Sequence, residues 1–220
     1  MPNRPPPQAY RGTPRRDVLK AGTRLSRLHD GRFEATGFNP TRADPHWGGG
    51  RFDSTEADPY GFLYAAEDDF CAVSESLLRD LPLSATGAQL LPRKALAHRK
   101  LSWIAPTTDL SLVSLKSGRD LAAVSQDAWL TQCEAKDYCF TRRWGHRIRE
   151  WAPWAQGLVW RSRREGASLA YVFFEDRCTG SFEEVEDSAF PPPAGNRLDR
   201  EPGESYVRRL LAAYNVTIFR

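Results

Sequence analysis

Residues 61–78, GFLYAAEDDFCAVSESLL, join two different patterns of apolar residues. The first six residues form a short apolar run, which is typical of a buried strand. From Phe70 onward, apolar side chains recur near helical spacing and predict a helix over residues 70–78. Asp68 or Asp69 would cap the start of this helix, where carboxylates are favourable. The sequence therefore predicts a strand that leads directly into a helix.

The segments on both sides of this pair predict a mixed fold. Residues 38–50 contain Asn-Pro, Asp-Pro and three consecutive glycines, so they predict a long loop. Apolar runs predict strands at residues 24–29, 101–104, 110–114, 157–160, 169–174 and 216–219. Helices are predicted after Gly118 and over residues 141–151 and 204–214. Short strands with scattered helices favour an α+β fold over regular βαβ winding.

The length of 220 residues fits one domain with appendages. Residues 1–22 are rich in Pro and Arg and lack periodicity, so we expect a flexible arm. Residues 23–190 are expected to form the single domain. Residues 191–220 begin with Pro-Pro-Pro-Ala-Gly and predict a C-terminal extension, a helix and a short strand packed on that domain.

The charge of the chain is uneven although the net value is only +3. Residues 141–164 hold seven Arg and one Glu, whereas residues 165–205 hold ten acidic residues and three Arg. We expect a basic face beside an acidic one. A protein that binds nucleic acid directly would be more uniformly basic, so no nucleic-acid partner is predicted.

Several classes of protein are excluded by missing patterns. No apolar run approaches 18 residues, so no membrane span is predicted, and no secretory signal is visible. The four cysteines stand apart, which favours neither a zinc ribbon nor a disulfide framework and leaves a reducing cytoplasm as the expected location. The sequence has no P-loop, no His-Glu-x-x-His and no Gly-x-Ser-x-Gly, and its four histidines lie far apart. We expect no metal cofactor.

A distinctive order of short motifs remains. It runs from Arg24-Leu-Ser-Arg27-Leu-His29 through Gly49-Gly-Arg51-Phe-Asp53, Leu63-Tyr64-Ala-Ala66 and Ala72-Val-Ser-Glu75 to Gly157-Leu-Val-Trp-Arg-Ser162-Arg163 and the apolar strand after it.

Taken singly, the residues of these motifs leave ordinary roles open. Arg27 could pair with an acid on a neighbouring strand, Tyr64 could belong to the core, Glu75 could be solvated and Ser162 could be a turn residue. Arg51 has a stronger functional case because Gly-rich loops present backbone donors to anions.

The ordered series resembles the RES-domain family, named for its Arg, Glu and Ser. Arg27, Arg51, Tyr64, Glu75 and Ser162 fall on the positions of the family motifs, and the resemblance spans about residues 23–176. Two departures are Trp160, where Tyr is commoner, and a long segment between the Glu and Ser motifs.

This resemblance implies one ADP-ribosyltransferase-like domain with a central split mixed β-sheet flanked by helices. It implies a toxin that cleaves the nicotinamide–ribose bond of NAD by hydrolysis or phosphorolysis, as an NAD glycohydrolase or NAD phosphorylase. NAD would be the substrate, inorganic phosphate a possible acceptor, and a cognate antitoxin the protein partner. Catalytic roles are implied for Arg27, Glu75 and Ser162, and NAD-binding roles for these three with Arg51 and Tyr64.

The residue types suit this chemistry. Arginine grips a diphosphate with directed geometry, a carboxylate stabilises the positive charge that develops on the ribose, and Tyr64 offers a flat ring to nicotinamide. Two alternatives stay open: transfer of ADP-ribose to a protein, and a non-catalytic interaction protein that binds a partner through its Arg-rich face.

Overall fold

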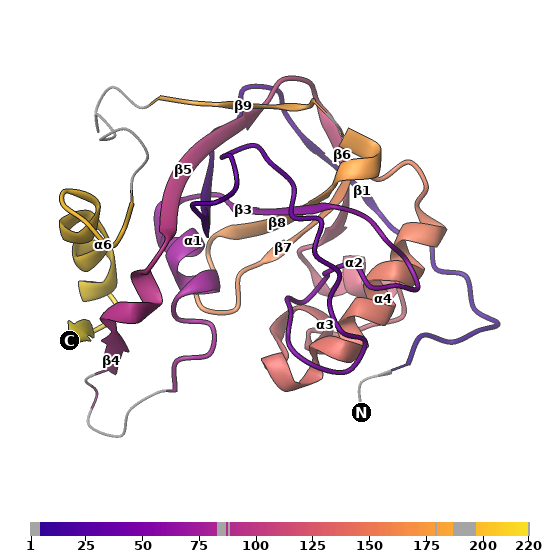
Figure 1. Ribbon diagram of the computed structural model, residues 1–220. Helices are drawn as coiled ribbons and strands as arrows, with labels where there is room; N and C mark the ends of the chain where they lie inside the picture. Colours follow the sequence, from indigo (N-terminus) through magenta and orange to yellow (C-terminus); the bar gives the residue numbers. More distant parts are fainter. Residues whose placement is uncertain (1–4, 83–86, 88, 179, 187–196, 220) are drawn as a thin grey trace.

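The computed structural model describes residues 5–82, 87, 89–178, 180–186 and 197–219 (Figure 1). Eight strands form the main sheet in the order β1-β6-β7-β8-β3-β2-β5-β9. Their bounds are Arg16–Leu19 (β1), Leu25–Asp30 (β2), Phe62–Ala66 (β3), Arg99–Pro106 (β5), Leu110–Leu115 (β6), Gly157–Arg161 (β7), Leu169–Phe174 (β8) and Phe182–Glu184 (β9). The helices are Asp69–Ser76 (α1), Gly118–Ala123 (α2), Trp129–Gln132 (α3), Tyr138–Trp151 (α4), Glu175–Cys178 (α5) and Gly203–Ala212 (α6).

The main sheet is divided between β2 and β3. These neighbours share a single antiparallel register pair, Ser26 with Ala66, whereas β3 pairs with β8 at five positions and β2 with β5 at six. The pairing is mixed, because β6 and β7 run parallel while the other neighbours run antiparallel. The predicted α+β class, with a split mixed sheet flanked by helices, is confirmed.

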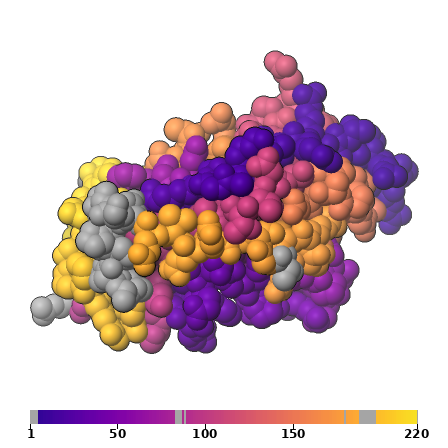
Figure 2. Space-filling model, turned by 90° about the horizontal axis from the view of Figure 1, so that it is seen from above, coloured from indigo at the N-terminus to yellow at the C-terminus, as the bar shows by residue number. Residues whose placement is uncertain are grey.

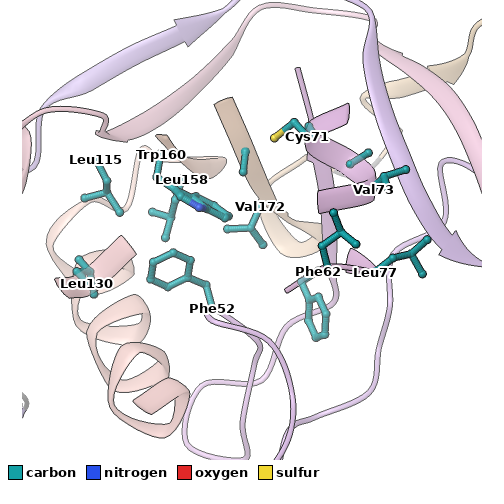
Figure 3. Close-up of a cluster of buried hydrophobic side chains, with 14 of the residues drawn as sticks. Phe52, Phe62, Cys71, Val73, Leu77, Leu115, Leu130, Leu158, Trp160 and Val172 are labelled. Carbon is teal, nitrogen blue, oxygen red and sulfur yellow. The ribbon is translucent and has the colours of Figure 1, made fainter. Parts of the chain in front are cut away.

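Apolar side chains cover both faces of the sheet. Along β7, Leu158 and Trp160 face one cluster and Val159 faces the other, and β8 alternates in the same way. This double burial explains why both strands appear in the sequence as unbroken apolar runs. Figure 3 shows Phe52 between Leu130 of α3 and Trp160 of β7, and the rings of Phe52 and Trp160 meet edge to face at 5.2 Å.

Helix α1 begins where the sequence predicted. The side chain of Asp68 caps it by accepting a hydrogen bond from the Cys71 N–H. Cys71 and Val73 are buried and belong to the same hydrophobic cluster as Phe62 of β3, part of which Figure 3 shows. Since only two residues separate β3 from α1, the helix must lie against the strand that precedes it.

The N-terminal segment differs from the expected flexible arm. Arg16–Leu19 form β1, which pairs antiparallel with β6 at four positions, and Leu19 is buried. The edge of β6 provides the backbone hydrogen-bond partners of β1, since a strand of four residues is not stable on its own. A strand of four residues at the edge of a sheet shows no apolar periodicity in the sequence. The Pro-rich residues before it favoured the prediction of an irregular segment.

The C-terminal segment contains a helix and a strand at the predicted places. Helix α6 buries Val207, Leu210 and Leu211 and packs against α1. Strand β10, Val216–Phe219, pairs parallel with β4, Gln89–Pro92, in a separate two-stranded sheet. Figure 2 shows this segment in yellow at one end of the molecule. Residues 191–196 lie outside the described residues, and the boundaries at 22/23 and 190/191 stay predictions.

Within the described residues, no helix combines the length and apolar character needed to cross a bilayer.

Replacement of Gly157 by Ala tests the packing of the sheet interior. A Cβ atom at this position of β7 would lie 2.3 Å from the carbonyl oxygen of Val172, so the backbone must shift. We expect a loss of about 1–3 kcal/mol in the free energy of unfolding, measured by urea denaturation. Gly118→Ala is the matched control, because nothing lies within 4 Å of its added Cβ, and it should change stability by less than about 0.5 kcal/mol. Equal stability of the two variants would contradict the register of β7 against β8.

Candidate active site

A cavity of about 200 Å³ lies where β2 and β3 separate. Ser26 and Leu28 of β2 line one side, and Tyr64 and Ala66 of β3 line the other. Helix α1 contributes Ala72 and Glu75, and Trp160 of β7 completes an aromatic wall with Tyr64. The split of the sheet thus creates a pocket with one carboxylate and flat apolar surfaces.

The carboxylate of Glu75 is held by one of its two oxygens. Oε1 accepts hydrogen bonds from the Ser162 hydroxyl at 2.6 Å and from the Arg163 N–H at 2.9 Å. Among the described residues, no hydrogen bond reaches Oε2. Because Glu75 lines the cavity and is half-buried, its orientation is fixed while one oxygen keeps its capacity to accept a hydrogen bond from a ligand.

Ser162 is brought to Glu75 across 87 positions of sequence. Its side chain is buried and does not line the cavity. The hydroxyl accepts a hydrogen bond from the Glu165 N–H at 3.0 Å and donates its own proton to Glu75. Ser162 therefore orients the carboxylate, and the geometry gives it no direct contact with a molecule in the cavity.

Tyr64 holds the Gly-rich loop, residues 48–53, against the cavity. Its hydroxyl accepts from the Phe52 N–H at 2.8 Å and donates to Asp53 at 2.9 Å, and the Gly50 N–H donates to the same carboxylate at 2.6 Å. Burial raises the pKa of Tyr64 well above its usual value, so the phenol keeps its proton. Burial also raises the pKa of Asp53, although its hydrogen bonds to Gly50 and Tyr64 oppose the shift.

Gly50 is required by the closeness of these groups. A Cβ atom there would lie 2.5 Å from Asp53 Oδ1 and 3.0 Å from the Tyr64 hydroxyl. The neighbouring Gly49 has a φ of +73°, a conformation that other residues rarely adopt. The three consecutive glycines thus bring backbone close to the cavity wall.

Arg51 lines the cavity, but protein groups occupy its guanidinium. It donates to the carbonyl oxygens of Leu130 and Cys133 and to the Tyr138 hydroxyl, at 3.2–3.3 Å. The guanidinium also lies 4.7 Å from the centre of the Tyr138 ring. Arg51 therefore joins the Gly-rich loop to the segment that contains α3 and α4. It contributes positive charge to the cavity, while its N–H groups donate mainly to protein atoms.

The position of Arg27 differs from the expectation that it is a catalytic and NAD-binding residue. Ser26 and Leu28 face the cavity, so the alternation of side chains along β2 places Arg27 on the opposite face of the sheet. There it is buried and donates to the Ala35 carbonyl oxygen at 2.6 Å. Burial lowers its pKa to about 10. The structure does not bring Arg27 into the cavity.

Two other arginines line the cavity and were missed in the sequence. Arg79 lies in the turn after α1, four residues beyond Glu75, and Arg99 lies at the start of β5, opposite Asp30 of β2. Arg79 bonds to Asp80 at 3.1 Å; burial opposes a higher pKa for its guanidinium, but Asp80 and Tyr138 outweigh burial and raise it. The spacing of four residues between Glu75 and Arg79 was a usable signal, whereas Arg99 could be placed only through the pairing of β2 with β5.

A second, wider cavity of about 740 Å³ begins on the other side of Arg79. Its basic lining residues are Arg79, Lys136, Arg163 and Arg164, and its acidic ones are Asp80 and Glu134. A narrow gap bordered by Glu75, Arg79, Arg163 and Arg164 adjoins both cavities. Arg79 is thus shared by the small cavity, the gap and the wide cavity.

No group of three His, Cys, Asp or Glu side chains within the described ranges is arranged to hold a metal ion.

The fold and the cavity define a single-domain α+β protein whose candidate site lies at the parting of its sheet. The model of the RES domain matches residues 24–193, so the chain belongs to the RES-domain family. Among solved structures it resembles the crystal structure of the M. tuberculosis MbcT–MbcA toxin–antitoxin complex, with a TM-score of 0.53 and 16% identity over 76% of this chain and 86% of that chain. At this identity the likeness shows a shared fold. No curated protein matches the chain.

Replacement of Tyr64 by Phe tests how the Gly-rich loop is held. The change leaves the Phe52 N–H without its acceptor and Asp53 without one donor, so the free energy of unfolding should fall by about 1–3 kcal/mol. Tyr10→Phe is the control, because this tyrosine is partly exposed and makes no hydrogen bond among the described residues. Amide hydrogen exchange at Phe52 should rise in the Tyr64 variant alone. Unchanged exchange there would show that the hydroxyl does not hold the loop.

Proposed function

We propose that this RES-domain protein cleaves the nicotinamide–ribose bond of NAD, by hydrolysis or phosphorolysis, as the toxin of a toxin–antitoxin pair. The observation that carries the proposal is the Glu75 carboxylate, fixed at the cavity through Oε1 by Ser162 and Arg163. Membership of the RES-domain family supports NAD as the substrate. The likeness to a solved toxin–antitoxin complex supports an antitoxin as the partner.

The fixed carboxylate suits the charge that this reaction develops. When the bond between nicotinamide and ribose breaks, its electron pair leaves with the nicotinamide and positive charge grows on the sugar ring. A carboxylate held in place before the reaction stabilises that charge without having to reorient. Glu75 is the cavity's acidic side chain within the described part of the chain, and its free oxygen can also accept a hydrogen bond from a ribose hydroxyl.

The size of the cavity indicates which part of NAD it receives. Pockets that enclose a whole small-molecule ligand usually have volumes of at least about 300 Å³. The cavity of about 200 Å³ is therefore too small to enclose all of NAD. It suits the nicotinamide and its ribose, with the rings of Tyr64 and Trp160 as a flat wall. Arg79 and Arg99 line the same cavity, and they supply positive charge for the diphosphate that follows the ribose.

The Arg-rich segment supports the alternative of a non-catalytic interaction protein less well than its composition suggested. Arg142 and Arg149 are buried, so these two arginines do not contribute to an exposed basic face. Arg142 donates to backbone carbonyls of the Gly-rich loop, and Arg149 pairs with Asp58 and Asp176. ADP-ribosyl transfer to a protein would use the same carboxylate. Analysis of the nucleotide products formed from NAD, with and without phosphate, identifies the group that accepts the ADP-ribose.

Glu75→Gln is the decisive variant. It keeps the size of the side chain and an acceptor oxygen but removes the charge that faces the developing cation. NAD turnover should fall by about two to three orders of magnitude, which corresponds to about 2.7–4 kcal/mol, while NAD affinity measured by calorimetry changes little. Expression of the wild-type protein in bacteria should deplete NAD and arrest growth, and expression of the variant should do neither.

Glu67→Gln is the matched control for Glu75→Gln. Glu67 is an exposed carboxylate that accepts a backbone hydrogen bond from Leu169, and it does not line the cavity. Its variant should keep wild-type turnover. Wild-type turnover in Glu75→Gln would overturn the assignment of the catalytic carboxylate, and absence of NAD turnover in the pure wild-type protein would overturn the proposed reaction.

Arg79→Gln and Arg99→Gln test the placement of the diphosphate. Each variant loses a charge-assisted contact worth about 1.5–3 kcal/mol, so KM for NAD should rise by roughly 10-fold to 150-fold, with a smaller change in kcat. Arg32→Gln is the control, since Arg32 is exposed, pairs with Asp30 and does not line the cavity. If both cavity variants keep the wild-type KM, the diphosphate lies elsewhere.

A further inference from the structure

The turn between β7 and β8 supplies both hydrogen bonds that orient Glu75. Ser162 donates through its hydroxyl and Arg163 through its backbone N–H, to the same oxygen. A backbone donor cannot follow the carboxylate by rotating a side chain, so the position of the turn sets the position of the carboxylate. A contact that holds Ser162 and Arg163 in place therefore acts on Glu75.

Tyr214, which follows α6, is one of these anchors. Its hydroxyl donates to Glu165 Oε2 at 2.5 Å. The N–H of the same Glu165 donates to Ser162 Oγ at 3.0 Å, and that hydroxyl donates to Glu75. A chain of three hydrogen bonds thus runs from the C-terminal segment to the carboxylate.

Tyr214 also touches the helix that carries Glu75. Its ring meets Phe70 of α1 edge to face, with the ring centres 6.3 Å apart, and its hydroxyl lies 3.3 Å from the Phe70 carbonyl oxygen. Burial and the hydrogen bond to Glu165 raise the pKa of Tyr214, so the phenol remains a donor at neutral pH. One side chain therefore contacts both α1 and the turn.

The turn also has other anchors. The Ser162 N–H donates to the Ser168 carbonyl oxygen at 3.0 Å, and the Ser168 N–H donates to that of Glu165 at 2.9 Å. Ser168 bonds to Asp68 at 2.6 Å and the Leu169 N–H bonds to Glu67, which hold the end of the turn that leads into β8. At the end that carries Ser162, the side chain of Arg164 donates to the Leu81 carbonyl oxygen at 2.6 Å. Tyr214 is the described side chain that reaches Glu165, the residue bonded directly to Ser162.

We propose that Tyr214 is a positioning residue for Glu75 and that the C-terminal segment forms part of the active-site scaffold. The family match ends at residue 193, so Tyr214 lies outside the matched domain. This inference rests on the proposed NAD-cleaving function for its kinetic consequence, but its structural consequence can be measured without NAD.

Tyr214→Phe is the test, because it keeps the ring packed on Phe70 and removes only the hydroxyl. Turnover of NAD should fall about three- to tenfold with an unchanged KM, since the loss of one neutral donor affects the orientation of the carboxylate and not substrate binding. In a Ser162→Ala background the same change should cause a clearly smaller loss, because the hydrogen bonds from Glu165 to Ser162 and from Ser162 to Glu75 are already missing and only the Arg163 N–H still joins the turn to the carboxylate. A tyrosine that only stabilises the fold would lower NAD turnover by the same factor in both backgrounds.

Tyr206→Phe is the matched control. Tyr206 lies on α6 and donates to the carboxylate of Asp69, at the end of α1 away from Glu75. Ser26 and Trp103 still hold this carboxylate in the variant. Its variant should keep wild-type turnover. Equal effects of the two tyrosine variants, or additive effects of Tyr214→Phe and Ser162→Ala, would overturn the positioning role.

Hydrogen exchange separates this inference from the proposed function. In Tyr214→Phe the amides of Arg163 and Glu165 should exchange at least about threefold faster than in the wild type, and in Tyr206→Phe they should not. Unchanged exchange at both amides would overturn the inference even if the protein cleaves NAD. Faster exchange in a protein without NAD turnover would support the positioning role of Tyr214 and overturn the proposed reaction.

Discussion

The separation of β2 from β3 is the constraint on which the site depends. After the pair formed by Ser26 and Ala66, the two strands no longer share a ladder, although each remains fully paired on its other side. Two halves of a sheet that diverge in this way would lose their relative position unless another element joined them. Helix α1 does so, because it follows β3 directly and its Asp69 accepts hydrogen bonds from Ser26 of β2 and Trp103 of β5. The opening is thus held at a fixed width by a buried carboxylate.

The same helix delivers the chemistry to this opening. Its first residues are fixed by the cap at Asp68 and by the bonds to Asp69, and Glu75 lies near its other end, against the cavity. The turn after β7 then meets Glu75 from the half of the sheet that contains β3. Arg51, Arg79, Arg163 and Arg164 border the same narrow gap as this carboxylate. Such an arrangement is complementary to a substrate that is anionic over most of its length and becomes cationic at one atom.

The sequence predicted the parts of this arrangement that local pattern determines. The strand and helix of residues 61–78, the cap at Asp68 and the order of the later strands follow from periodicity and short motifs. The family resemblance assigned Glu75 and Ser162 to one site, but the hydrogen bond between them appears only in the structure. The face of β2 on which Arg27 lies could not be predicted, because alternation tells that Arg27 and Leu28 lie on opposite faces but not which face meets the cavity. The partners of Arg51 come from a segment about 80 residues further along, and Arg99 reaches the site only through the pairing of β5 with β2. These features depend on tertiary contacts that no local pattern encodes.

The abundance of arginine has a structural explanation that narrows its functional one. Arg27 bonds to Ala35, Arg51 to Leu130 and Cys133, and Arg142 to Asp44 and Gly48, in each case through backbone carbonyl oxygens. Buried carbonyls of irregular segments need donors, and the five N–H groups of a guanidinium can serve several of them from one side chain. A lysine ammonium, compact and more strongly hydrated, would satisfy fewer carbonyls and cost more to bury. In the proposed function, the arginines left for the anionic substrate are therefore Arg79 and Arg99, whose side chains line the cavity and donate to no backbone carbonyl among the described residues.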